Sequence, residues 1–122
     1  MKEYRVELTR QAAAQLQSIY DYISYSLAAP MAAARILREI HRALDSLRQM
    51  PGRIKRTDEE PWYSRGIRRM RIRNYYLYFR IVEEDRQVQI LAVIYTARNQ
   101  TAQLQCLEDS QTWYESGDRV TD

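Results

Sequence analysis

The sequence predicts an α+β fold with elements in the order β-α-α-β-β-β, in which a helical hairpin covers one face of an antiparallel sheet. Three patterns carry this prediction. Apolar residues recur every three or four positions between residues 10 and 47, alternate with polar residues over 2–8 and 66–83, and run together over 87–96. At 122 residues, the chain is long enough to bury one core.

The first strand and the first helix follow each other without a break. In residues 2–8 the side chains of Tyr4, Val6 and Leu8 fall on one face, as in a short half-buried strand. Thr9 is a suitable N-cap for a helix over residues 10–27. That helix carries one apolar stripe, formed by Ala12, Leu16, Ile19, Tyr20, Ile23 and Leu27.

A second helix is predicted to begin at Pro30, because the first helical turn tolerates proline. Met50-Pro51-Gly52 ends the pattern, so the two helices form an antiparallel hairpin whose stripes meet in the core. The stripe of this helix consists of Ala33, Ile36, Leu37, Ile40, Leu44 and Leu47.

Residues 51–64 hold two prolines and the acidic run Asp58-Glu59-Glu60, which is typical of a loop. Strands are then predicted over 66–73, 76–83 and 87–96. The last is apolar on both faces, so it should be central in the sheet.

The strands over 66–73 and 76–83 each have one apolar and one polar face. The apolar faces should meet the helices, and the opposite face of the sheet should therefore display arginine and tyrosine. The residues expected on that displayed face are Arg69, Arg71, Arg73, Tyr76, Tyr78 and Arg80.

Composition restricts the class of protein. With 45% hydrophobic and 29% charged residues, the chain is an ordinary soluble domain, expected in the cytoplasm, without a signal peptide or an apolar run that spans a membrane. A single cysteine, Cys106, and a single histidine, His41, argue against a disulfide or a structural zinc site. We expect no metal and no cofactor.

Charge is distributed unevenly. Residues 1–106 carry 18 Lys/Arg and 11 Asp/Glu, a balance of +7, whereas residues 107–122 carry one Arg and five acids, a balance of −4. We therefore expect a folded basic domain over residues 1–109 and an acidic C-terminal tail over 110–122. Of the cationic residues only Lys2 and Lys55 are lysines, a bias that favours planar contacts to phosphate or carboxylate.

Five arginines within nine residues make the strand over 66–73 the strongest candidate for a functional surface. Arginine forks fit phosphate oxygens, and neighbouring tyrosines can stack on bases. The alternative is a solvated strand face whose arginines pair with Asp58, Glu59 and Glu60, with Tyr76 and Tyr78 as cross-strand packing partners. The five arginines are Arg65, Arg68, Arg69, Arg71 and Arg73, and Arg98 follows the last strand.

Several segments, taken in order, resemble the RelE/ParE superfamily of bacterial type II toxins over residues 2–100. They are LTRQAAAQLQSIYDYIS, the helix that begins at Pro30, SLRQMPGR, GIRRMRIRNYYLYFRI and ILAVIYTARN. The long helical hairpin is similar to the ParE and plasmid-stabilisation branch. The resemblance implies a toxin that a co-expressed antitoxin neutralises, and that arrests growth by poisoning DNA gyrase or by cutting ribosome-bound mRNA.

The resemblance also implies roles for single residues. Arg69 and Arg71 align with basic strand positions that RelE-like nucleases use, and Arg98 lies near a second basic position at the end of the last strand. These three are the catalytic candidates if the protein is a metal-independent, ribosome-dependent endoribonuclease. The sequence departs from that set at Tyr76, where the nucleases carry arginine, and has no tyrosine after the last strand until Tyr114. Predicted target-binding residues are Arg68, Arg73, Tyr76, Tyr78, Arg80 and Tyr95.

These departures favour gyrase binding over RNA cleavage. The ribosome-dependent mRNA endonuclease remains the alternative, and a non-toxic basic RNA-binding module is a second alternative. Expected partners are a cognate antitoxin and either DNA gyrase or ribosome-bound mRNA, without a membrane. A dimer or a toxin–antitoxin hetero-oligomer is the expected assembly.

Overall fold

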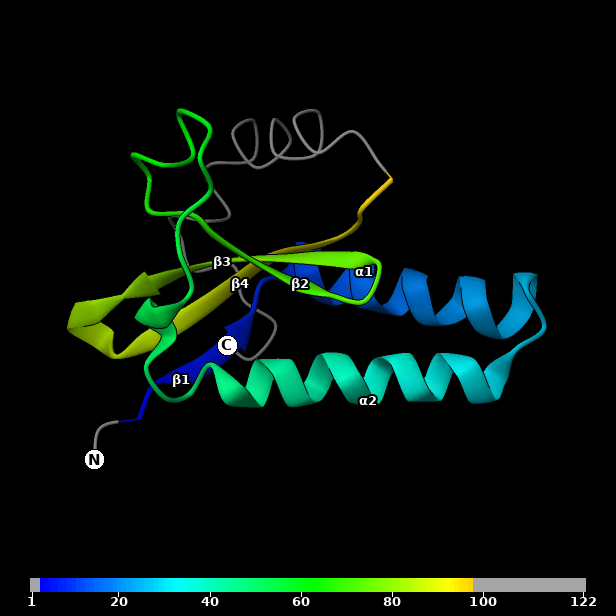
Figure 1. Cartoon of the computed structure of the whole chain (residues 1–122). Helices are drawn as coiled ribbons and strands as arrows, with labels where there is room; N and C mark the ends of the chain where they lie inside the picture. The colour runs from blue at the N-terminus through cyan, green and yellow to red at the C-terminus, as the bar shows by residue number, and fades with distance from the viewer. Residues whose placement is uncertain (1–2, 98–122) are drawn as a thin grey trace.

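The computed structural model describes residues 3–97, and Figure 1 shows how their helices and strands are arranged. The predicted α+β class and the order of elements are confirmed. The main elements are β1 (Arg5–Leu8), α1 (Arg10–Asp21), α2 (Pro30–Ser46), β2 (Arg68–Ile72), β3 (Tyr75–Val82) and β4 (Gln87–Tyr95). Short turns are η1 (Tyr22–Ser26), η2 (Pro51–Arg53) and η3 (Glu83–Asp85). Arg98, Cys106 and the predicted acidic tail lie outside the described residues.

The four strands form one sheet in the order β1-β4-β3-β2, so β4 is central as predicted. The antiparallel prediction is wrong for β1, which pairs parallel with β4 in the register Val6 with Val88. Tight turns join β2 to β3 and β3 to β4 and make those pairs antiparallel. Both helices and two strands separate β1 from β4, and such a long crossover allows parallel pairing.

Thr9 fixes the start of α1 on the sheet. Its hydroxyl accepts a hydrogen bond from the backbone N–H of Ala12 at 3.2 Å and donates to the carbonyl of Ile90 at 3.0 Å. The predicted N-cap is therefore confirmed, and the same side chain joins the helix to β4. The predicted helix over 10–27 is divided, because α-helical geometry ends at Asp21 and the π-helical turn η1 continues to Ser26.

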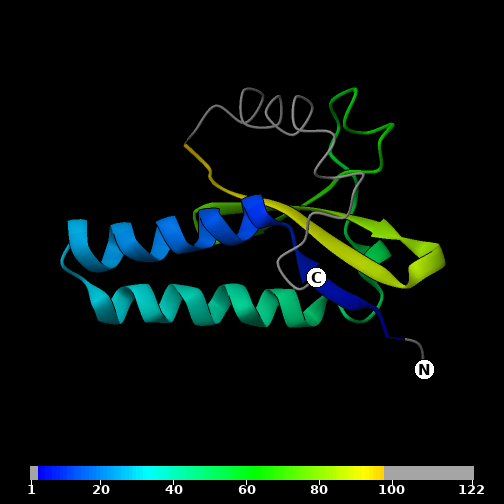
Figure 2. The ribbon, with the colours of Figure 1, turned by 180° about the vertical axis from the view of Figure 1, so that it is seen from behind.

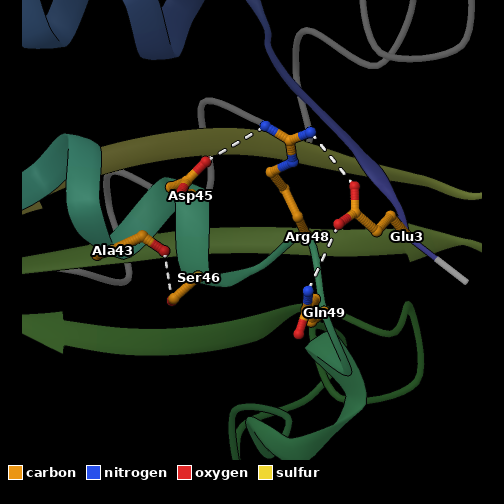
Figure 3. Close-up of polar contacts among 6 residues, drawn as sticks. All are labelled: Glu3, Ala43, Asp45, Ser46, Arg48 and Gln49. Carbon is orange, nitrogen blue, oxygen red and sulfur yellow. Dashed lines mark hydrogen bonds and ion pairs between the residues drawn. The ribbon is translucent and has the colours of Figure 1, made fainter. Parts of the chain in front are cut away.

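The C-terminal end of α2 is joined to the first residues of the chain. As Figure 3 shows, the guanidinium of Arg48 contacts Asp45 and Glu3, each at 3.3 Å, and the amide of Gln49 also donates to Glu3. These side chains are exposed, so each contact contributes little to the free energy of unfolding. They join the end of the hairpin to the residues that lead into the edge strand β1.

Both helices pack on one face of the sheet, which Figure 2 shows from behind. Most of each predicted stripe meets there, and Ile40 and Phe79 are fully buried, but Leu27 is 55% exposed and its predicted place in the core is wrong. Nonpolar burial of this extent is the main source of stability in a domain of this size. The buried residues of this core are Ala12, Leu16, Ile40, Leu44, Leu47, Leu77, Phe79, Val88, Ile90 and Val93.

The opposite face of the sheet was expected to be open, and this is wrong for part of it. The loop between η2 and β2 packs Trp62 against that face, where only 3% of Trp62 remains exposed. A β-bulge in β4 at Leu91 adds a further apolar residue there. The resulting second core consists of Trp62, Ile67, Tyr78, Leu91, Ala92 and Ile94.

Among residues 3–97, no helix combines the length and apolar character needed to cross a membrane.

Candidate functional site

Arg69, Arg71 and Tyr76 form the accessible part of the predicted arginine face, which we call the arginine–tyrosine cluster. Strand pairing places Arg71 opposite Tyr76 and Arg69 opposite Tyr78. The Cζ atom of Arg69 lies 4.2 Å from the centroid of the Tyr76 ring, and that of Arg71 lies 6.0 Å from it. One aromatic ring therefore orients two exposed guanidinium groups, which leaves their outer N–H groups available to a partner.

Tyr78 lies beside this cluster but is 1% exposed, so its predicted display on the surface is wrong. Its side chain packs in the second core beneath Trp62. Burial raises the pKa of the Tyr78 hydroxyl, and a hydrogen bond from Arg69 opposes that change. The packing interpretation of Tyr78 therefore agrees with its position, and the hydroxyl helps to hold Arg69.

Arg68 and Arg73 do not join the cluster. Arg68 faces the helices' side of the sheet, where its guanidinium donates to the carbonyl of Ile54 at 2.6 Å and braces the segment after η2. Arg73 lies in the β2–β3 turn with φ +53°, and its guanidinium contacts both carboxylate oxygens of Glu39 on α2, at 2.5 and 2.8 Å. The expectation that Arg73 shares a face with Arg69 and Arg71 is therefore wrong.

The contact with Arg73 also changes the ionisation of Glu39. The hydrogen bonds from Arg73 lower the pKa of the Glu39 carboxyl, and the positive charges of Arg73, Arg42 and Arg35 add to that effect. The Arg71 Nε in turn donates to the Arg73 carbonyl at 2.9 Å. A chain of contacts thus runs from α2 through the turn to the arginine–tyrosine cluster.

The remaining predicted site residues lie elsewhere. Arg80 is further along β3, where its Nε donates to the Gln89 side chain at 2.8 Å. Tyr95, at the end of β4, is 45% exposed and contacts the Tyr75 ring with centroids 5.7 Å apart. Arg98 lies beyond the described residues. The structure therefore brings together three of the predicted residues and separates the others.

The acidic run does not neutralise this cluster within the described part of the chain. Asp58 lies 3.8 Å from Lys55, and the Glu60 carboxylate accepts the backbone N–H of Ser64 at 3.1 Å. No ion pair joins this run to Arg69 or Arg71 among residues 3–97. The same range contains no group of three or more His, Cys, Asp or Glu side chains suited to a metal ion.

A groove between α1 and α2 is a second candidate surface that sequence reasoning missed. Its volume is about 810 Å³, and its apolar walls include Leu16, Tyr20 and Leu37. Its basic side chains, Arg38, His41 and Arg42, come from α2, and no carboxylate lines it. A smaller groove of about 460 Å³ continues past His41 along β1. The sequence did contain a signal for this groove. Tyr20 and Leu37 make the apolar stripes of the two helices wider than the part that the sheet covers.

The comparison with known proteins agrees with the observed fold. Residues 6–100 match the family model of the ParE toxin of the type II toxin–antitoxin system parDE. A search among curated protein sequences finds no match.

Solved structures with similar folds come from toxin–antitoxin systems. The chromosomal ParDE system of P. aeruginosa aligns with TM-score 0.63 and 26% identity, over 75% of this chain and 95% of that one. The RelBE2 toxin–antitoxin complex of Mycobacterium tuberculosis aligns with TM-score 0.56 and 26% identity, over 80% and 97%. The archaeal RelE–RelB complex of Pyrococcus horikoshii shares the fold, with TM-score 0.53 and 17% identity over 79% and 98%.

The matched family model spans most of the chain, and the fold, the helical hairpin and the order of elements agree with it. The protein is therefore a type II toxin–antitoxin toxin and belongs to the ParE toxin family of the RelE/ParE superfamily.

Proposed function

We propose that the free toxin arrests growth by binding and inhibiting DNA gyrase. The observation that carries this proposal is the composition of the arginine–tyrosine cluster. Arg69, Arg71 and Tyr76 remain accessible, whereas Arg68 and Arg73 are engaged with the backbone of Ile54 and with Glu39.

This arrangement suits binding better than RNA cleavage. Cleavage needs a positioned proton donor and several cations around the phosphate at once. Among residues 3–97 the cluster supplies two guanidinium groups and one ring, a smaller set than such cleavage chemistry uses. Arginine and tyrosine are, however, the residues that contribute most to protein–protein binding when they lie together at the centre of an interface.

A supercoiling assay tests the proposal. The purified toxin should inhibit gyrase, and an Arg69→Ala, Arg71→Ala double variant should need at least about tenfold more protein for the same inhibition. The matched control is Arg5→Ala, an exposed arginine on β1 at the opposite edge of the sheet. Unchanged gyrase activity at a large molar excess of toxin would refute the proposal.

Ribosome-dependent mRNA cleavage remains the second candidate, because the same two arginines can stabilise a negatively charged phosphorane beside the Tyr76 ring. Primer extension on ribosome-bound mRNA separates the two functions. New 5′ ends that disappear in the Arg69→Ala, Arg71→Ala variant would favour cleavage, and an unchanged mRNA pattern together with gyrase inhibition would favour binding.

We also propose that the groove between α1 and α2 receives the neutralising antitoxin. Its apolar walls fit the apolar face of a partner helix, and Arg38, His41 and Arg42 fit carboxylates along that helix. An Arg38→Glu, Arg42→Glu variant should lose antitoxin affinity by at least about tenfold. Arg35→Glu on the same helix is the control, since Arg35 does not line the groove. Equal losses in both variants would contradict this assignment.

A further inference from the structure

The turn between the two helices exposes an unusual amount of apolar surface. We define the hairpin tip as residues 22–31. It contains four of the seven large apolar side chains that are exposed among residues 3–97. The exposed fractions are 57% for Tyr22, 77% for Tyr25, 55% for Leu27 and 80% for Met31. Exposed apolar side chains gathered within one short segment are often part of an interaction site.

The tip and the residues beside it in the sequence are almost free of charge. Asp21 is the only charged residue between positions 11 and 34, although 29% of the whole chain is charged. Its carboxylate accepts a hydrogen bond from the Gln17 amide at 3.0 Å. Depletion of charge together with aromatic and methionine side chains is the composition of an interface centre. Such a surface offers little attraction to phosphate or to a charged peptide, so a neutral and apolar partner fits it best.

The backbone of the tip is specialised as well. The π-helical turn η1 buries Ile23 and Ser24 while Tyr22 and Tyr25 remain exposed. Ala28 has φ +52°, a conformation in which its Cβ is strained and which glycine would adopt more easily. π-Helical turns and strained residues are both frequent at functional sites. The tip therefore combines exposed apolar area with two independent structural features of a binding site.

We propose that two copies of this chain meet at the hairpin tip and form a weak symmetric dimer. In a two-fold symmetric dimer, the same surface of both copies forms the interface. A second tip therefore provides the neutral, apolar partner that suits the first tip. Figures 1 and 2 show that the hairpin extends beyond the sheet. Two tips can therefore meet while the arginine-rich β2 strands of two cationic copies stay apart, which keeps their mutual repulsion small.

The area explains why this dimer is weak. The four exposed side chains together offer on the order of 500 Å² per copy. A standard stable interface buries about 800 Å² per partner. None of the four lines the groove between α1 and α2, so that groove stays available when the tips are paired.

Sedimentation equilibrium of the purified full chain tests the proposal without gyrase or antitoxin, so its outcome is independent of the proposed function. The weight-average mass should rise from 14.6 kDa toward twice that value as protein concentration increases. A Tyr25→Glu, Met31→Glu variant should weaken association at least about tenfold, because each dimer would bury unpaired carboxylates. The control Met50→Glu changes a residue that is 75% exposed at the other end of α2 and should associate like the wild type.

Cross-linking supplies a second readout. In a Cys106→Ser background, Tyr25→Cys should form a disulfide-linked dimer on mild oxidation, whereas Met50→Cys should not. A wild-type chain that stays at 14.6 kDa at every concentration would overturn the proposal. So would equal dimerisation of the Tyr25→Glu, Met31→Glu variant and the wild type.

Discussion

The two faces of the sheet are covered by different kinds of structure. Two regular helices cover one face, with Ile40 and Phe79 fully buried between them and the strands. The other face receives the irregular loop between η2 and β2, which is anchored there by Trp62. The core on the helical face is the larger, with ten buried residues, whereas the core on the loop face has six. The helical face should therefore determine global stability, and the loop face should respond locally.

The largest expected effect comes from the helical face. Phe79→Ala should lower the free energy of unfolding by about 3–5 kcal/mol, because it leaves a cavity between β3 and both helices. Urea denaturation measures this loss. Phe79→Leu is the conservative control and should cost less than about 1.5 kcal/mol. If Phe79→Ala cost no more than that control, this face would not be the main core.

Trp62→Ala should have a smaller and more local effect. The loss of Trp62 burial should lower the free energy of unfolding by about 2 kcal/mol. The loss stays this small because the loop can relax into the space that the ring leaves. Within the loop, the Thr57 amide donates to the Ile67 carbonyl and the Ile67 amide donates to the Trp62 carbonyl. Hydrogen exchange should accelerate at these two amides, while the amides of α2 stay protected. Equal acceleration in α2 and the loop would mean that the two faces unfold together.

Tyr78→Phe tests the polar contact that joins the loop face to the arginine–tyrosine cluster. At neutral pH this substitution should lower the free energy of unfolding by about 1 kcal/mol, the usual contribution of a hydrogen bond such as the one with Arg69.

The same variant has a defined pH dependence. The pKa of Tyr78 is raised by burial, so the neutral hydroxyl stabilises the fold below its usual pKa of 10.0, and this stability is lost as pH rises through the folded value. The variant should lose less stability than the wild type between neutral and strongly alkaline pH. Identical alkaline profiles would show that Tyr78 is not buried in solution.

The smallest expected effect is at the edge where α2 meets the β2–β3 turn. Hydrogen bonds from Arg73 lower the pKa of Glu39, so the ionised carboxylate stabilises the fold above its usual value of 4.5. That contribution is lost as pH falls through the folded pKa. Melting temperatures measured from neutral to acidic pH should fall less steeply in Glu39→Gln than in the wild type. Parallel curves would contradict the contact.

Periodicity explains which parts of the fold were predictable. Stripes such as Leu16 with Ile23 and the alternation along β3 predict both helices and the strand faces, because buried residues recur at the spacing of each element. Trp62 stands in a segment without period, so nothing local indicates that it docks on the sheet. The direction of β1 was also not predictable, since a long crossover permits either orientation.

The candidate site was predicted only in part for a related reason. Alternation correctly placed Arg69 and Arg71 on one face of β2. Arg73 follows the same alternation in sequence, but it belongs to the turn, and its positive φ turns its side chain toward Glu39. Strand ends are the least certain part of such a pattern, and here the end of β2 decides whether three arginines or two form the cluster.

The parallel pairing of β1 with β4 has a consequence for synthesis of the toxin. The N-terminus of a chain leaves the ribosome first. Val6 can nevertheless pair with Val88 only after most of the domain has emerged. The central strand β4 is the last strand to be synthesised, so the nascent chain cannot complete its sheet before β4 has emerged. A complete sheet, and with it a folded toxin, thus requires translation to have passed residue 95.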